Sequence, residues 1–143
     1  EEIMKGTKCQ RTYEKQYVRD FQKCMGQDID IPYNPKALYL RMNLIKEELN
    51  ELQDEVEKSI FEFKENSGKI NKETKQNILK ELCDLMYVVS GFAVTFGLPV
   101  QVAFNRVHQS NMSKLVNGIP QLNDWGKVQK GKNYKPPNME DLV

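Results

Sequence analysis

Hydrophobic residues recur at three- and four-residue steps through most of the chain, which is the period of helices that bury one face. The longest stripe begins after Pro35 and is broken at residues 66–68. Its members are Leu38, Met42, Ile45, Leu49, Leu52, Val56, Ile60 and Phe63. A second stripe, within about residues 72–96, holds Ile78, Leu82, Leu85, Val89, Phe92 and Phe96. The pattern therefore predicts two long helices joined by a short turn.

Glycine and proline mark the ends of the remaining elements. A first helix is predicted over residues 12–25, with Tyr13, Tyr17, Phe21 and Cys24 at helical steps and Gly26 after it. Gly97 ends the third helix, and a fourth runs from Pro99 to about Leu115. No run has the alternation typical of a strand.

The predicted fold is therefore all-α, an antiparallel helical bundle of about four main helices. We expect residues 1–143 to form a single domain. Residues 1–11 are expected to be a flexible N-terminus, and residues 119–143, rich in Gly, Pro, Asn and Lys, an irregular C-terminal tail.

Net charge and cysteine content limit the kinds of partner and the compartment to expect. The formal net charge is +1, so no global field favours a nucleic acid polymer or a membrane surface. The apolar stretch 85–100 is too short and too interrupted for a membrane span. Three cysteines without CxxC spacing favour a reduced protein, which we expect to be cytoplasmic.

Two carboxylate pairs are the main candidates for chemistry. Glu48 and Glu51 lie three residues apart, as do Glu81 and Asp84, so each pair projects from one helix face. Asp84 is the only charged residue between Leu82 and Val100, and burying it would be costly without a positive partner. With one histidine in the chain, a set of oxygen ligands suits Mg²⁺, with Mn²⁺ able to substitute.

The two pairs are predicted to face each other. Both lie roughly 20–25 Å from the turn near Ser67, given a rise of about 1.5 Å per residue. A shared divalent-metal site follows from this register, although a surface charge pattern remains an alternative from the residues alone.

These motifs resemble those of the all-α nucleoside triphosphate pyrophosphohydrolases, the MazG-like and phosphoribosyl-ATP pyrophosphohydrolase-like superfamily. Its signature is EExxE on one helix and ExxD on the next, here Glu47, Glu48 and Glu51, then Glu81 and Asp84. Residues 107–114 are similar to the VHxxNxSK stretch of a branch that includes dUTP-hydrolysing enzymes. The resemblance covers about residues 18–139, and it departs in the tail, where Trp125 separates Asp124 from Gly126.

The resemblance implies hydrolysis of a nucleotide between its α- and β-phosphates. The implied metal ligands are Glu48, Glu51, Glu81 and Asp84, and Glu47 is the residue implied to help activate water. Candidate phosphate contacts are Asn111, Lys114, Lys127 and Lys130. Candidate contacts to the nucleobase or sugar are Phe21, Asn43 and Tyr87.

The expected function is thus Mg²⁺-dependent cleavage of a nucleoside or deoxynucleoside triphosphate, with dUTP-like substrates favoured and nucleotide-pool sanitation as the role. Two alternatives stay open. One is phosphoribosyl-ATP pyrophosphohydrolase of histidine biosynthesis, against which the extra first helix and the long tail argue. The other is a non-catalytic helical interaction module. The superfamily also implies a homodimer or homotetramer, in agreement with the long apolar faces.

Overall fold

The computed structural model describes residues 16–143, and the regular structure in that part of the chain is helical. Residues 16–24 are helical, followed by α2 (Pro35–Glu65), α3 (Lys72–Thr95), α4 (Val100–Met112) and the short 3-10 helix η1 (Glu140–Leu142). Two isolated β-bridges occur in the C-terminal region, but residues 16–143 contain no strand. The all-α prediction is confirmed.

The chain divides into two compact units, residues 1–97 and residues 98–143, which are described separately below. The prediction of a single domain therefore stays a prediction. The expected flexible segment 1–11 lies outside the described residues.

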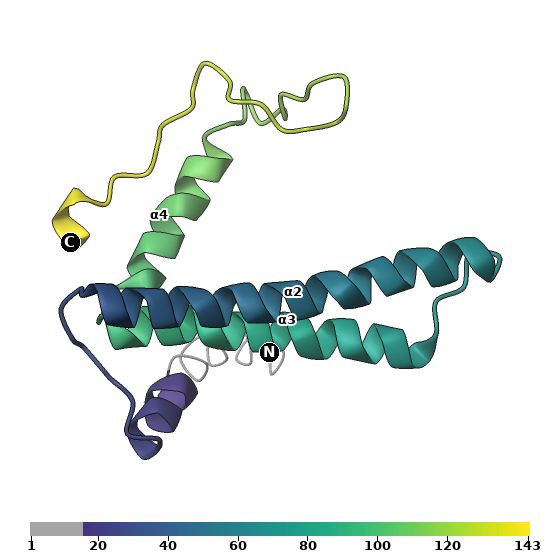
Figure 1. Cartoon of the computed structure of the whole chain (residues 1–143). Helices are drawn as coiled ribbons and strands as arrows, with labels where there is room; N and C mark the ends of the chain where they lie inside the picture. The colour runs from purple at the N-terminus through teal and green to yellow at the C-terminus, as the bar shows by residue number, and fades with distance from the viewer. Residues whose placement is uncertain (1–15) are drawn as a thin grey trace, which may run out of the picture. The chain divides into compact units, whose positions relative to one another are not determined.

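Helices α2 and α3 form an antiparallel hairpin in the first unit, and Figure 1 shows them side by side along their length. At the start of α2, Asn34 Oδ1 accepts a hydrogen bond from the Ala37 N–H at 3.0 Å, with Pro35 in the first helical position. At its end the chain reverses through Ser67 and Gly68, whose φ angles are 53° and 82°. The turn thus begins α3 beside the last turn of α2.

Glu62 fixes the start of α3 against the end of α2. Glu62 is buried, with 6% of its surface exposed. Its carboxylate accepts hydrogen bonds from the Asn71 N–H and from the Asn71 side-chain amide, both at 3.0 Å. It also accepts one from Thr74 Oγ1 at 2.7 Å. The Thr74 bond is the main reason why the pKa of Glu62 lies below its ordinary value, with the Asn71 bonds adding to it. This clamp sets the register in which the two helices run back along each other.

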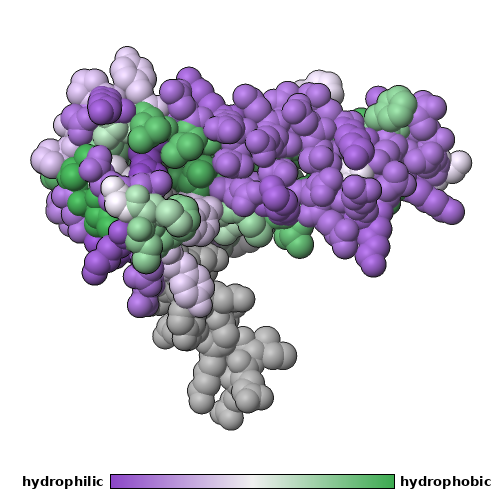
Figure 2. Space-filling view, turned by 60° about the horizontal axis from the view of Figure 1, so that its bottom comes forward, coloured by the Kyte–Doolittle hydropathy of each residue, from purple (hydrophilic) through white to green (hydrophobic). Residues whose placement is uncertain are grey.

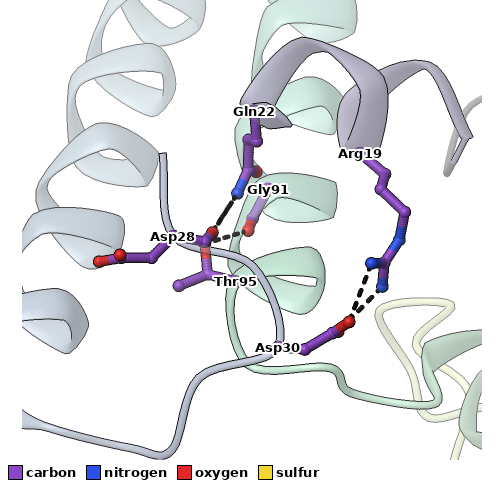
Figure 3. A network of polar contacts seen from close by, with 6 residues as sticks. All are labelled: Arg19, Gln22, Asp28, Asp30, Gly91 and Thr95. Atoms are coloured by element: carbon purple, nitrogen blue, oxygen red, sulfur yellow. Dashed lines mark hydrogen bonds and ion pairs between the residues drawn. The ribbon is translucent and has the colours of Figure 1, made fainter. Parts of the chain in front are cut away.

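The helix at residues 16–24 is held against α3 by a buried glutamine. Gln22 is 1% exposed, and its amide donates to the Asp28 carbonyl at 2.9 Å and to Thr95 Oγ1 at 3.1 Å, while Thr95 Oγ1 donates to the Gly91 carbonyl (Figure 3). Gly91 leaves room for this contact, because a Cβ there would lie 3.0 Å from Gln22 Oε1. The buried face of this helix therefore consists of Val18 and Gln22. Of the predicted apolar face, Tyr17, Phe21 and Cys24 are exposed instead, and residues 12–15, with Tyr13, lie outside the described residues.

The loop after this helix closes onto the end of α3. Arg19 pairs with Asp30 through two hydrogen bonds of 2.9 Å (Figure 3). The Asp30 N–H also donates to the Val94 carbonyl. Gly97, at φ 63°, follows α3 where a Cβ would lie 2.9 Å from Asp30 Oδ1. A residue without a side chain is therefore needed there for two reasons, backbone conformation and space.

The hydrophobic core of the described residues is small. Its buried apolar members are Val18, Ala37, Ala93, Val94 and Phe96. Many residues of the two predicted stripes are instead exposed, including Leu49, Val56, Ile60, Leu82 and Val89. Figure 2 shows one face of the molecule, with hydrophobic side chains gathered toward one end of the hairpin and a mostly hydrophilic surface over the rest. The pattern identified the helices correctly, but a two-helix hairpin covers only part of each stripe.

The second unit consists of α4 and the chain that follows it. Helix α4 ends at Met112, three residues earlier than predicted, because Ser113 Oγ bonds back to the Ser110 carbonyl and accepts the Lys135 N–H at 2.9 Å. Arg106 pairs with Asp141 of η1, and this ion pair lowers the pKa of Asp141 to about 2. The tail is irregular, as predicted, but the Ser113–Lys135 hydrogen bond and the Arg106–Asp141 ion pair hold it to α4 and to the turn that ends α4.

No single helix within residues 16–143 is long and apolar enough to cross a membrane. Helices α3 and α4 meet the length and hydropathy criteria only when they are taken together as a bent pair, and core helices of soluble proteins meet the same criteria.

Candidate active site

Three of the four predicted metal ligands converge on one point of the hairpin. One carboxylate oxygen from each of Glu48, Glu51 and Glu81 lies within 4.8 Å of the other two. We call these three residues the carboxylate cluster. Glu48 and Glu51 lie one turn apart on α2, and the clamp near Glu62 brings Glu81 of α3 opposite them. The helices therefore meet in the register that residue counting predicted.

The negative charges of the cluster act on one another. The pKa of Glu48 is raised by desolvation first, and then by the charges of Glu51, Asp84, Glu81 and Glu47. The pKa of Glu51 is raised by desolvation and by close contact with the Glu81 carboxylate. Like charges at this separation disfavour ionisation unless a cation is present. The electrostatics of the site therefore favour binding of a positive ion.

Glu81 provides the most specific sign of a missing partner. It is 9% exposed, and its Oε2 atom is buried without a hydrogen-bond donor among residues 16–143. Glu55, one turn beyond Glu51 on α2, also has a buried Oε2 atom without a donor in that part of the chain. A buried carboxylate oxygen without a donor is costly, and a hard cation would satisfy it. The residues present thus fit a divalent cation.

Asp84 is not one of the three residues of the carboxylate cluster, but its charge acts on Glu48, and its side chain pairs with Lys80. Lys80 Nζ lies 2.7 Å from Asp84 Oδ2 and 3.1 Å from Glu81 Oε1. The Asp84 side chain is 42% exposed, and it has the positive partner that a carboxylate in an apolar run would need if it were buried. The spacing of four residues between Lys80 and Asp84 was the signal available in the sequence.

Glu47 and Asn43 are exposed on α2, beside the cluster and one turn before it. The charge of Glu47 contributes to the raised pKa of both Glu48 and Glu51, which places its carboxylate in the electrostatic field of the site. Glu47 is thus near the cluster without being part of it.

Phe21 and Tyr87 contact each other edge to face, with ring centroids 5.6 Å apart and planes at 82°. Tyr87 lies one turn beyond Asp84 on α3, so the pair places the helix at residues 16–24 beside the acidic site. Two of the three candidates for base or sugar contact are thereby brought together.

The four phosphate candidates lie in the second unit. Lys114 Nζ donates to Asn111 Oδ1 at 3.0 Å, so these two form one polar pair at the end of α4. Lys130 lies over the ring of Tyr134, 4.8 Å from its centroid, and Lys127 is exposed in the loop held by Asn123. Trp125, in the same loop, is 93% exposed. The unit presents these lysines at its surface.

The model of the phosphoribosyl-ATP pyrophosphohydrolase family matches residues 18–111, about two thirds of the chain. The chain belongs to this family. The phosphoribosyl-ATP pyrophosphohydrolase family is part of the MazG-like all-α superfamily, so the predicted relationship is confirmed. No curated protein matches the chain. The matched range contains the carboxylate cluster, Asp84 and Asn111, whereas the three candidate lysines lie beyond it.

Members of the phosphoribosyl-ATP pyrophosphohydrolase family are nucleotide pyrophosphohydrolases that act on phosphoanhydride bonds, so the prediction of an enzyme of this class is confirmed. The family is typically dependent on a divalent metal, and the carboxylate cluster provides oxygen ligands of the kind such a metal requires. The roles of the individual residues stay predictions.

Proposed function

We propose that this protein hydrolyses a nucleoside or deoxynucleoside triphosphate to the monophosphate and pyrophosphate, using Mg²⁺. The observation that carries the proposal is the convergence of Glu48, Glu51 and Glu81, with a buried oxygen of Glu81 that has no donor among residues 16–143. In the reaction, water adds to the α-phosphorus, the bond to the bridging oxygen breaks, and pyrophosphate leaves.

Glu48, Glu51, Glu81 and Asp84 would hold the metal. When bound, a divalent cation neutralises phosphate charge and makes water a better nucleophile at neutral pH. Glu47 lies one residue off the ligand face, where its carboxylate can orient the attacking water and accept its proton. Without the carboxylates of the cluster, a polyanionic substrate would meet no cation and would repel the nucleophile.

The contacts to substrate follow from the remaining candidates. Asn111, Lys114, Lys127 and Lys130 would bind phosphate oxygens, since amides and ammonium groups donate to them readily. The Phe21–Tyr87 pair and Asn43, close to the acidic site, would contact the base or sugar. The resemblance of residues 107–114 to the dUTP-hydrolysing branch favours a deoxynucleotide and a role in nucleotide-pool sanitation.

Phosphoribosyl-ATP is the second candidate substrate, and the family match over residues 18–111 supports it equally. Both substrates present the same α–β phosphoanhydride bond, so the carboxylate cluster serves either. The helix at residues 16–24 and the chain after Met112 are the parts that would distinguish a nucleoside triphosphate from phosphoribosyl-ATP.

We also propose that the enzyme is a cytoplasmic homodimer or homotetramer. Exposed apolar residues along the hairpin, among them Leu49, Ile60 and Met86, would be covered by a second copy. Cys24 and Cys83 are free and exposed, which suits a reducing compartment.

A pyrophosphate-release panel tests the substrate assignment. Purified enzyme with Mg²⁺ is supplied in turn with the common ribo- and deoxynucleoside triphosphates, dUTP and phosphoribosyl-ATP. The proposal expects release from triphosphates, which is lost in Glu81→Gln and retained in Glu73→Gln, an exposed acid on the same helix. Turnover of phosphoribosyl-ATP alone would assign the second candidate, and turnover by Glu81→Gln would refute the site.

A further inference from the structure

Lys80 reaches into the acidic site from the surface of α3. Its side chain is 62% exposed, and its ammonium group bridges Glu81 Oε1 at 3.1 Å and Asp84 Oδ2 at 2.7 Å. Its charge is also felt across the hairpin, where it partly offsets the raised pKa of Glu51. Lys80 thus forms ion pairs with two of the four predicted metal ligands.

We propose that Lys80 is a built-in competitor for the divalent cation, holding Glu81 and Asp84 until a metal displaces it. The inference rests on the proposed function. The lysine and the metal require the same carboxylate oxygens: an ammonium group donates to them at the distances observed here, whereas Mg²⁺ binds oxygens at about 2.0–2.1 Å. Two positive charges a few ångströms apart repel, so metal binding and the Lys80 contacts exclude each other.

The displacement is expected to be easy. The Lys80–Asp84 pair is exposed, and such an ion pair contributes little, because holding a long side chain in one place costs entropy and water screens the charges. In addition, Lys80 precedes Asp84 by four residues, and this order of charges is the less favourable one on a helix. Lys80 should therefore weaken metal binding modestly, by roughly three- to tenfold, without preventing it.

A purely organising role for Lys80 predicts the opposite sign. If its ammonium group were needed to keep Glu81 and Asp84 in position, its removal would let the mutually repelling carboxylates separate, and metal affinity would fall. The direction of the change in affinity therefore distinguishes the two roles.

The test is calorimetric titration of the full-length protein with Mn²⁺, with no nucleotide present. The variants are Lys80→Met, which removes the charge and keeps much of the side chain, and Lys72→Met as the matched control. Lys72 is exposed at the start of the same helix, eight residues away or about 12 Å, beyond the screening length of physiological salt. Lys80→Met is also made in a background of Asp84→Asn.

Competition predicts that Lys80→Met binds Mn²⁺ three- to tenfold more tightly than wild type, that Lys72→Met binds like wild type, and that the gain falls by at least half in the Asp84→Asn background. An affinity that is unchanged or reduced in Lys80→Met overturns the inference and leaves the proposed function standing. An equal gain in the Asp84→Asn background also overturns it, since Lys80 would then act only as a distant charge. Absence of Mn²⁺ binding by the wild type would overturn the proposed function as well.

Discussion

The clamp between Glu62 and Thr74 holds the hairpin in the register that brings the carboxylate cluster together. Replacing Thr74 by Val tests it most cleanly, because Val keeps the size of the side chain and removes only the hydroxyl. Thr74 is fully buried, and its Oγ1 donates to the Glu62 carboxylate at 2.7 Å. A hydrogen bond to a charged acceptor contributes about 1.5–3 kcal/mol. Since the Asn71 donors remain, we expect Thr74→Val to lose about 2 kcal/mol of unfolding free energy.

Thr74→Ser is the matched control. It keeps the hydroxyl and loses one buried methyl group, which costs about 1 kcal/mol. Urea unfolding followed by far-ultraviolet circular dichroism at pH 7 measures both variants. Thr74→Val should be the less stable of the two. Equal stability of Thr74→Val and wild type, or a larger loss in Thr74→Ser, would refute the clamp.

The difference in stability between wild type and Thr74→Val should depend on pH, with a sign that the pKa of Glu62 determines. The Thr74 bond is the main cause that lowers the pKa of Glu62 from its ordinary 4.5, so the stability gained is fully present above that value. It is lost as the pH falls through the lowered folded-state pKa. The difference between wild type and Thr74→Val should therefore shrink below about pH 4.5. A constant difference from pH 7 to pH 3 would contradict this reasoning.

Three further predictions concern Gly97 at the end of α3, the chain after Gly118, and the Arg106–Asp141 ion pair. Gly97→Ala should lose about 2–3 kcal/mol in urea unfolding, and Gly26→Ala, with similar φ but open space, about 1 kcal/mol; equal losses would refute the Asp30 contact. Truncation after Gly118 should raise KM or abolish turnover, and unchanged kinetics would exclude Lys127 and Lys130 as phosphate contacts. Asp141→Asn should speed tryptic cleavage at Lys132 at pH 7, whereas an unchanged rate would show that the Arg106 pair does not anchor the tail.

The helices and their register were predictable from sequence because each depends on local signals. Pro35 and Gly97 mark ends of long elements through their restricted or permissive backbone, and the structure places helix boundaries beside both. Counting residues from the turn near Ser67 was enough to place Glu48 and Glu51 opposite Glu81, since the helical rise is constant.

The Glu62–Thr74 clamp and the Lys80 ion pairs were not predicted, for different reasons. Glu62 is one of many acids in residues 47–65, and its partners depend on the path of the turn through Ser67 and Gly68, which sequence does not specify. Lys80 was visible through its spacing to Asp84, but such pairs are common on helix surfaces.

The exposure of Asp84 could not be read from the sequence, because hydropathy does not report which face of a helix is covered. Asp84 stands in an apolar run, yet Leu82, Met86 and Val89 of that run are themselves exposed in the described chain. Asp84 therefore keeps access to water and to Lys80.

Whether Glu81 completes a binding site for a divalent cation is decided by the Mn²⁺ affinity of Glu81→Gln, measured by calorimetry. The variant keeps the size of the side chain and removes the charge of a buried carboxylate. We expect wild type and Glu73→Gln to bind Mn²⁺ alike, and Glu81→Gln, with an unchanged circular dichroism spectrum, to bind about tenfold more weakly or worse. Binding of Mn²⁺ by Glu81→Gln with the affinity of the wild type would contradict this expectation.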